Sequence, residues 1–248
     1  MAAGPGDPGL LTLAGHAALA QSRFVLAPAT FRRSFAALLE GKEVESPFQM
    51  AHASVVAWVE ERLPRGGVTF LLPGDFGSFS PFQSFVAHFG DRARVVPGVG
   101  AHAAAAAVLK KTFDLAGVAH ATVLTSPRAF TAEGRVRLAR YAQPGHTLVV
   151  YMNDLPLPRL VEELREGFGR DVPIALLEEL SCPGERVTCG TLGTICDLVG
   201  DRDPFGIDSS NPEPTLALVV AGEALGADED PSWWDRRYEK LWKPRGVR

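Results

Sequence analysis

The sequence predicts an α/β fold, built on a mostly parallel sheet with helices on its faces. Two observations carry this prediction. Short apolar runs alternate with helical segments along the chain, and two of these runs, at 68–72 and 95–96, stop at Pro-Gly turns. Parallel strands that end in glycine turns place their loops side by side at one edge of a sheet. We therefore expect the functional site at that edge.

The first half of the chain alternates expected strands with expected helices. Strands are expected at 24–27, 68–72 and 95–96, and helices at 10–20, 30–39, 49–63, 81–89 and over the alanine run 103–107. Pro73-Gly74 and Pro97-Gly98 cannot continue a strand, so each ends the run before it. The amphipathic segment 49–63 is expected to bury one face: Val55, Val56, Trp58 and Val59.

A polar segment at 110–117 is where we expect the chain to divide into two domains, 1–115 and 116–248. In the second part, strands are expected at 121–125, 147–152, 172–177, 185–189 and 215–221, and helices at 134–142, 157–166 and 191–199. The segment 202–214 is rich in Asp, Pro and Ser and is expected to be an exposed loop.

The tail at 227–248 carries four large aromatic residues among charges: Trp233, Trp234, Tyr238 and Trp242. Aromatic side chains of this size need cover from water. The tail is therefore expected either to pack back on its domain or to complete a subunit contact.

Composition limits the classes of function. The chain has 248 residues, of which 46% are hydrophobic, enough to fill a substantial core. No apolar run approaches the roughly 20 residues that span a bilayer, and the N-terminus lacks the plan of a signal peptide, so we expect a cytoplasmic protein without a membrane partner. A net charge of −4 gives no general attraction to nucleic acid, so any anionic ligand must be met by locally placed arginines.

Three cysteines, Cys182, Cys189 and Cys196, are spaced seven residues apart. This spacing matches no zinc pattern, and an odd number leaves one thiol unpaired in any disulfide scheme. We expect reduced and mostly buried thiols. The six histidines show no ligand spacing either, so no metal site is expected.

Six short motifs follow one another along the chain. They are Gly4-Pro5-Gly6-Asp7-Pro8 with Leu10-Leu11-Thr12, Pro73-Gly74-Asp75, Pro97-Gly98-Val99, Val149-Val150-Tyr151-Met152, Glu185-Arg186-Val187 with Gly190-Thr191-Leu192, and Leu216-Ala217-Leu218-Val219-Val220-Ala221-Gly222. Together they resemble the tetrapyrrole (corrin/porphyrin) methylase family, S-adenosylmethionine-dependent enzymes that methylate ring carbons in making vitamin B12 and sirohaem. Residues 121–125 and the short aromatic and basic tail look most like the branch that methylates carbon 11 of precorrin-4 or cobalt-precorrin-4.

The resemblance implies two α/β domains with S-adenosylmethionine held in the cleft between them, and a homodimer. Carried over to this sequence, the cofactor contacts are Pro5, Pro73, Gly74, Asp75, Ser78, Gly100, Ala101, Met152 and the backbone of Leu180. Glycine turns let backbone groups approach the methionine and ribose parts of the cofactor. The Asp75 carboxylate can accept from a hydroxyl or an ammonium, and Met152 can cover the adenine. Taken alone, Asp75 would also suit a helix-capping turn.

Methyl transfer from a sulfonium to a carbon mainly needs alignment and exclusion of water, without a metal or a side-chain nucleophile. The substrate class implied by the resemblance is a large macrocycle with many carboxylates, which arginines bind well. Arg128, just past the 121–125 strand, is the first candidate for this role; weaker candidates are Arg32, Arg33, Lys110 and Lys111. Asp7 could orient the macrocycle or take a proton, or it could be a simple helix cap.

Some features depart from the family pattern. Only three residues precede Gly4, where the family has a full β-strand, so either the start is misassigned or truncated, or the first sheet lacks its central strand. Phe76-Gly77-Ser78-Phe79-Ser80 replaces the usual Pro-Ser-Leu-Tyr-Gly, and Ser126-Pro127 intervenes before Arg128. Two alternatives to methylation at carbon 11 therefore stay open. One is methylation of another tetrapyrrole carbon or a non-tetrapyrrole acceptor, and the other is a family member that binds cofactor or partner without catalysis.

Overall fold

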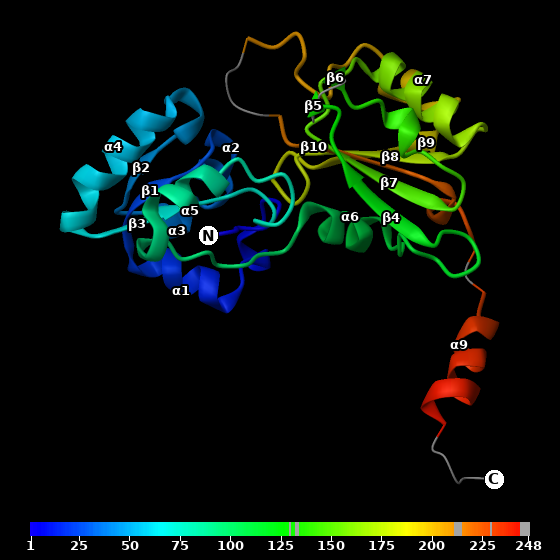
Figure 1. Cartoon of the computed structure of the whole chain (residues 1–248), viewed down its shortest axis with the longest axis horizontal. Helices are drawn as coiled ribbons and strands as arrows, with labels where there is room; N and C mark the ends of the chain where they lie inside the picture. The colour runs from blue at the N-terminus through cyan, green and yellow to red at the C-terminus, as the bar shows by residue number, and fades with distance from the viewer. Residues whose placement is uncertain (129, 132–133, 211–214, 229, 244–248) are drawn as a thin grey trace.

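Two main β-sheets organise the structure, a computed structural model that describes residues 1–128, 130–131, 134–210, 215–228 and 230–243 (Figure 1). The first sheet has the strand order β2-β1-β3, and the second has the order β4-β7-β10-β8-β9. The first lies at the left of Figure 1 and the second at the right, with helices around both. The α/β class predicted from the sequence is confirmed.

The first sheet is parallel, as predicted. Its strands are β2 (Glu43–Glu45), β1 (Ser22–Leu26) and β3 (Gly67–Phe70). The central strand, β1, carries the fully buried side chains of Phe24, Val25 and Leu26. The surrounding helices are α1 (Leu13–Gln21), α2 (Ala29–Ser34), α3 (Ala36–Leu39), α4 (His52–Arg62) and α5 (Gln83–Phe89). They fall within the predicted helical segments or within one residue of them. α1 begins later than predicted because the Thr12 hydroxyl caps it, accepting the Gly15 amide at 3.0 Å.

Residues 1–3 take the place of a strand next to β3. The Leu72 amide donates to the Met1 carbonyl at 3.0 Å, and the Ala3 amide donates to the Leu72 carbonyl at 2.8 Å. On the other side, the Ala2 amide donates to the Val96 carbonyl at 2.9 Å. The chain therefore fills the position between the end of β3 and Val96. The strand predicted at 95–96 is an extended segment rather than a regular strand, because its backbone pairing with Ala2 is a single hydrogen bond.

The second sheet is mixed, which corrects the prediction of a mostly parallel one. Its strands are β4 (Ala121–Thr125), β7 (His146–Tyr151), β10 (Ala217–Ala221), β8 (Pro173–Glu178) and β9 (Arg186–Thr191). β4 and β7 are parallel, whereas β10 runs antiparallel to β7 and β8, and β9 runs antiparallel to β8. The segment between β8 and β9 is too short for a crossover helix, so the two strands form a hairpin.

Helices pack on both faces of the second sheet. On one face, α6 (Ala101–Leu109) places Ala104 and Ala105 in a core with Val149 and Leu177. On the other face, α7 (Leu157–Phe168) and α8 (Ile195–Val199) pack in a core with alternate residues of the same strands. α6 thus packs on the second sheet, although the proposed boundary at 115/116 assigns it to the first domain. The division into two domains stays a prediction.

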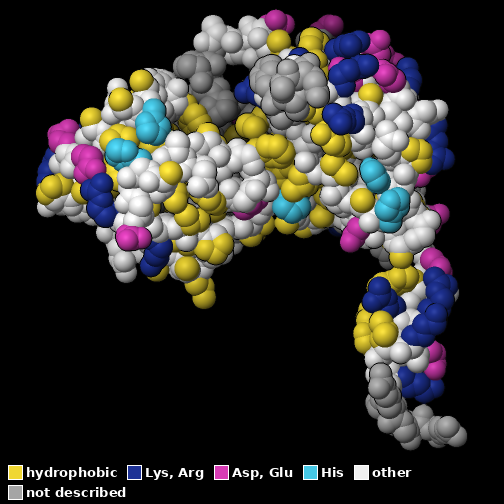
Figure 2. Space-filling model, viewed as in Figure 1, with side chains coloured by type: hydrophobic (Ala, Val, Ile, Leu, Met, Phe, Trp, Pro, Cys, Tyr) yellow, Lys and Arg dark blue, Asp and Glu magenta, His cyan; other side chains and the backbone are white. Residues whose placement is uncertain are grey.

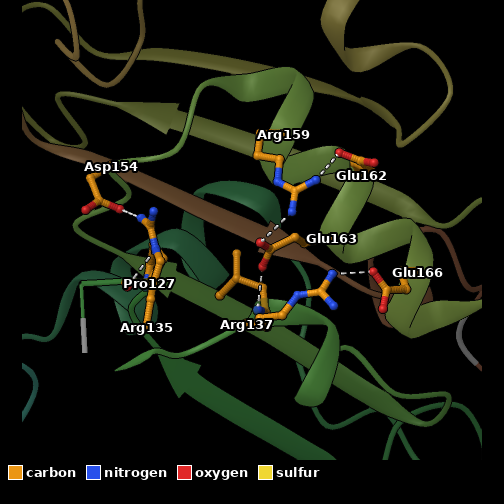
Figure 3. Close-up of polar contacts among 9 residues, drawn as sticks. Pro127, Arg135, Arg137, Asp154, Arg159, Glu162, Glu163 and Glu166 are labelled. Atoms are coloured by element: carbon orange, nitrogen blue, oxygen red, sulfur yellow. Dashed lines mark hydrogen bonds and ion pairs between the residues drawn. The ribbon is translucent and has the colours of Figure 1, made fainter. Parts of the chain in front are cut away.

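The helix predicted at 134–142 is wrong. The segment instead forms β6 (Gly134–Arg135), paired with β5 (Phe130–Thr131), and a 3-10 turn at Leu138–Arg140. Polar contacts hold it against α7 and the loop before α7 (Figure 3). Arg135 pairs with Asp154 (Figure 3). The buried Glu163 carboxylate accepts the Leu138 amide at 2.8 Å. These tertiary contacts outweigh local helix propensity.

The helix predicted at 191–199 is wrong over its first four residues, because β9 continues through Thr191 and α8 begins at Ile195.

The three cysteines are free thiols. Cys182 is buried, but Cys196 is half-buried and Cys189 is exposed on β9, so the prediction of mostly buried thiols is wrong.

The described part of the tail forms α9 (Ser232–Arg237) and a π-helical turn (Tyr238–Trp242), and it extends away from the second sheet (Figures 1 and 2). Trp234 is 62% exposed and contacts Trp242. This part of the tail does not pack back on the domain, and a subunit contact stays a prediction. Residues 211–214 of the predicted loop, and 229 and 244–248 of the tail, lie outside the described residues. None of the helices in the described ranges has the length and apolar character needed to traverse a bilayer.

Candidate cofactor-binding site

A pocket opens between residues of the two sheets. Its wall includes residues 72–75 and 78–82 after β3, the end of β7, and residues 215–218 at the start of β10. Eight of the nine residues predicted to contact the cofactor line it: Pro5, Pro73, Gly74, Asp75, Ser78, Ala101, Met152 and Leu180. The ninth, Gly100, lies directly against the Asp75 carboxylate. Segments far apart in the sequence thus meet at one place.

Two glycine turns are joined by backbone hydrogen bonds at this pocket. The Gly4 amide donates to the Gly74 carbonyl at 3.1 Å, and the Gly74 amide donates to the Gly4 carbonyl at 2.7 Å. Their φ angles are +75° and +71°, in the left-handed region that glycine adopts without strain. The pair fixes Pro5 next to the Pro73-Gly74-Asp75 turn at the pocket wall.

The Asp75 carboxylate has one oxygen in use and one without a partner. Its Oδ1 atom accepts the Gly77 amide at 2.7 Å, which is the turn-capping role. Its Oδ2 atom is buried and has no hydrogen-bond partner among the described residues. A buried acceptor without a donor is costly, so a ligand that supplies a donor here gains free energy. An ammonium or a ribose hydroxyl of S-adenosylmethionine fits this requirement.

Tyr151 is a polar wall residue that the sequence reasoning did not single out. Its hydroxyl lies 3.2 Å from the His102 backbone amide and 3.1 Å from His102 Nδ1, and its ring packs on Phe79. Burial raises the pKa of Tyr151 to about 12, with a further contribution from the negative charge of Asp75. The hydroxyl is therefore protonated at neutral pH. Its position at the end of β7, next to Met152, is the one sequence signal that could have found it.

Apolar side chains make up most of the remaining wall, including Phe79, Met152, Leu177, Leu180 and Leu218. Phe79 and Met152 have φ angles of 54° and 46°, which are strained for residues with a Cβ. Such conformations cost about 1–3 kcal/mol each and cluster at ligand sites. Met152 is 40% exposed, so its thioether is available to an aromatic ring such as adenine.

The two residues predicted to act on the substrate are not in the pocket wall. Asp7 Oδ1 accepts the Gly9 amide at 2.7 Å, so its carboxylate caps the 3-10 turn Pro8–Leu10. Arg128 is exposed after β4, and its backbone amide donates to the Ser126 hydroxyl at 3.2 Å. Their roles toward a substrate stay predictions.

The four weaker candidates for binding carboxylates lie on the surface or pair locally. Arg32 lies 3.3 Å from a carboxylate oxygen of Glu45, and Arg33 lies 3.9 Å from one of Glu179. Lys111 donates to the Ala227 carbonyl at 2.8 Å, and Lys110 is exposed at the end of α6. Within the ranges that the structure describes, no group of three or more His, Cys, Asp or Glu side chains is arranged to hold a metal ion.

Comparison with known proteins extends the resemblance to most of the chain. Residues 2–196 match the family of Tetrapyrrole (Corrin/Porphyrin) Methylases. The precorrin-4 C(11)-methyltransferase of Pseudomonas aeruginosa is 30% identical over 253 aligned residues, covering 98% of this chain and 96% of that protein. A Rhodococcus erythropolis protein of the same name is 32% identical and covers 92% of each chain.

Solved structures show the same fold. A cobalt precorrin-4 methyltransferase matches with a TM-score of 0.73 at 22% identity, covering 93% of this chain and 95% of that one. The uroporphyrin-III C-methyltransferase of Thermus thermophilus, solved in complex with S-adenosylhomocysteine, matches with a TM-score of 0.68 at 26% identity, covering 91% of this chain and 97% of that one. The family and the enzyme class predicted from the motifs are confirmed: the chain belongs to the tetrapyrrole (corrin/porphyrin) methylase family and is a methyltransferase.

Proposed function

We propose that the chain transfers a methyl group from S-adenosylmethionine to carbon 11 of precorrin-4 or cobalt-precorrin-4 in cobalamin biosynthesis. The observation that carries this proposal is the match, over 98% of the chain, to a relative named precorrin-4 C(11)-methyltransferase. A second relative of that name matches over 92% of the chain. The pocket supports the cofactor part of this proposal, because its wall combines apolar side chains with a buried Asp75 oxygen that has no partner among the described residues.

In this proposal the nine predicted residues hold the cofactor, which supplies a sulfonium methyl group when bound. Asp75 Oδ2 accepts a hydrogen bond from its ammonium or a ribose hydroxyl. Backbone groups at Pro5, Gly74 and the 100–101 turn come close to it, since no bulky side chain intervenes at the glycines. Met152 and its apolar neighbours cover the adenine, the apolar wall excludes water, and Leu180 contacts the cofactor through its backbone. Ser78 and Pro73 complete the wall.

The substrate would lie against residues outside the pocket wall. Arg128 is exposed at the end of β4 and is proposed to bind a substrate carboxylate. Asp7 is exposed two residues after Pro5, and it is proposed to orient the macrocycle or to accept a proton. Arg128→Ala should therefore raise the KM for the macrocycle while leaving the affinity for S-adenosylhomocysteine unchanged.

The test is incubation with S-adenosylmethionine and precorrin-4 or its cobalt form, followed by mass spectrometry. One added methyl group, located on carbon 11 by nuclear magnetic resonance of the product, supports the proposal. If S-adenosylhomocysteine binds in calorimetry but no product forms, precorrin-4 and its cobalt form are excluded as substrates. Methylation of another tetrapyrrole carbon or of another acceptor would then be favoured. The uroporphyrin-III C-methyltransferase of Thermus thermophilus is 26% identical to this chain, so uroporphyrin III is the competing substrate to include. Absence of both binding and product would favour a member without catalysis.

The proposal also includes a homodimer that acts in the cytoplasm. The exposed aromatic side chains of the tail, including Trp234 and Trp242, support a subunit contact because large apolar surfaces are usually covered. Light scattering on the full chain at micromolar concentration tests the dimer. A monomer mass would contradict it.

A further inference from the structure

His102 makes two polar contacts with the hydroxyl of the pocket residue Tyr151. The Tyr151 side chain is part of the wall, and His102 follows the wall residue Ala101 at the start of α6. The His102 backbone amide lies 3.2 Å from the hydroxyl oxygen, and His102 Nδ1 lies 3.1 Å from the same atom. Asp75 lies against the same glycine, Gly100, where an added Cβ would lie 2.6 Å from Asp75 Oδ2 and 2.9 Å from His102 Nδ1.

Counting hydrogen bonds shows that the presence or absence of a proton on His102 Nδ1 decides what Tyr151 offers to a ligand. A tyrosine hydroxyl donates one proton and has two lone pairs, and the His102 backbone amide always occupies one of them. When His102 is neutral with Nδ1 bare, the hydroxyl donates to Nδ1, and its second lone pair stays available. When His102 is protonated, Nδ1–H donates to the oxygen, both lone pairs are in use, and the hydroxyl proton must point elsewhere.

We propose that His102 is a positioning residue that sets the hydrogen-bonding polarity of Tyr151 in the cofactor pocket. Neutral His102 with a bare Nδ1 makes the hydroxyl an acceptor for the cofactor, and protonated His102 makes it a donor. This inference rests on the proposed function, because S-adenosylmethionine brings an ammonium and ribose hydroxyls that need acceptors. Asp75 Oδ2 is a second acceptor among the residues that line the pocket.

The expected consequence is a pH-dependent affinity for the cofactor. Histidine side chains ordinarily change charge between pH 5 and pH 8, whereas Tyr151, with a pKa of about 12, keeps its proton throughout. Affinity should fall by about tenfold or more as His102 gains a proton, the effect of losing one hydrogen bond to a charged donor. The titratable groups that the structure places against His102 are Tyr151 from β7 and Asp75 from the loop after β3.

The test is calorimetric titration of S-adenosylhomocysteine into the full chain at pH 8 and at pH 5.5. The wild-type chain should bind about tenfold more weakly at the lower pH. His102→Asn supplies an uncharged side-chain acceptor, so it should keep the affinity at pH 8 and lose the pH dependence. Tyr151→Phe should bind weakly at both pH values. His16→Ala, which removes an exposed histidine on α1, should keep the wild-type profile. The amine of Met1, with a pKa of about 6, titrates equally in all variants.

Nuclear magnetic resonance of the ligand-free chain gives a readout that does not depend on the cofactor. The ¹⁵N shift of His102 should report a bare, hydrogen-bonded Nδ1 at pH 8. A protonated Nδ1 at pH 8, or equal pH dependence in wild type and His102→Asn, would overturn the inference. Failure of the wild-type chain to bind S-adenosylhomocysteine at pH 8 would instead reject the proposed function. The ¹⁵N shift would still show whether His102 Nδ1 accepts a hydrogen bond from the Tyr151 hydroxyl.

Discussion

Replacing Gly100 with alanine tests whether the wall around Asp75 binds the cofactor. The Gly100 backbone has φ −68° and ψ 147°, which alanine adopts freely, so the added methyl group is the whole perturbation. That methyl carbon would lie 2.6 Å from Asp75 Oδ2 and 2.8 Å from His102 Cε1. Both separations are too short for non-bonded atoms, so at least one of the two side chains must move.

Two quantities should change in Gly100→Ala. Overpacking should change the free energy of unfolding, and displacement of the Asp75 carboxylate should change the affinity for S-adenosylhomocysteine. Overpacking should lower the free energy of unfolding by about 1–3 kcal/mol. Displacing the carboxylate that accepts from a charged donor costs about 1.5–3 kcal/mol of binding, so the Kd for S-adenosylhomocysteine should rise about tenfold to a hundredfold.

Calorimetric titration and urea unfolding of the same Gly100→Ala preparation measure both effects. Gly67→Ala is the matched control, because its added Cβ would meet no atom closer than 3.4 Å and Gly67 lies outside the pocket wall. It should bind as the wild type does. Wild-type affinity and stability in Gly100→Ala would refute the role given to this wall.

Three further predictions concern binding, pH and stability. Asp75→Asn should raise the Kd for S-adenosylhomocysteine about tenfold in calorimetry, because the unpartnered carboxylate oxygen loses its charge. An unchanged Kd would count against a contact between Asp75 and the cofactor. Burial lowers the pKa of the Met1 amine from 8.0 to about 6, so the unfolded chain binds more protons between these values. The free energy of unfolding should therefore rise by about 2 kcal/mol from pH 6 to pH 8, and acetylation of Met1 should remove that rise in urea titrations. Glu163→Ala should cost about 1–3 kcal/mol of unfolding free energy, because the buried Leu138 amide loses its acceptor; the exposed Glu162→Ala should cost less than about 0.5 kcal/mol, and equal losses would contradict the argument.

The pocket turns were predictable because their signal is local. Pro73-Gly74-Asp75 stops a strand through the backbone of three residues, and this needs no information from elsewhere in the chain. The direct pairing of Gly4 with Gly74 is different, since it joins residues 70 positions apart. The order of the family motifs implied that these turns lie near each other, and the backbone hydrogen bonds show how.

Long-range contacts explain where the sequence reasoning failed. β10 inserts between β7 and β8, and no local pattern encodes which neighbours an apolar strand will have. The segment 134–142 has helical propensity, but a hydrogen bond to Glu163 and an ion pair with Asp154 hold it in a non-helical conformation. His102 was missed because a histidine at the start of an alanine-rich helix looks the same whether or not a tyrosine from another strand meets it.

A crystal structure of the chain with S-adenosylhomocysteine tests the central claim most directly. The account predicts the ligand in the pocket between the two sheets, with one of its donors on Asp75 Oδ2 and the adenine against Met152. Ligand density at another place, or Asp75 Oδ2 still without a donor, would contradict it.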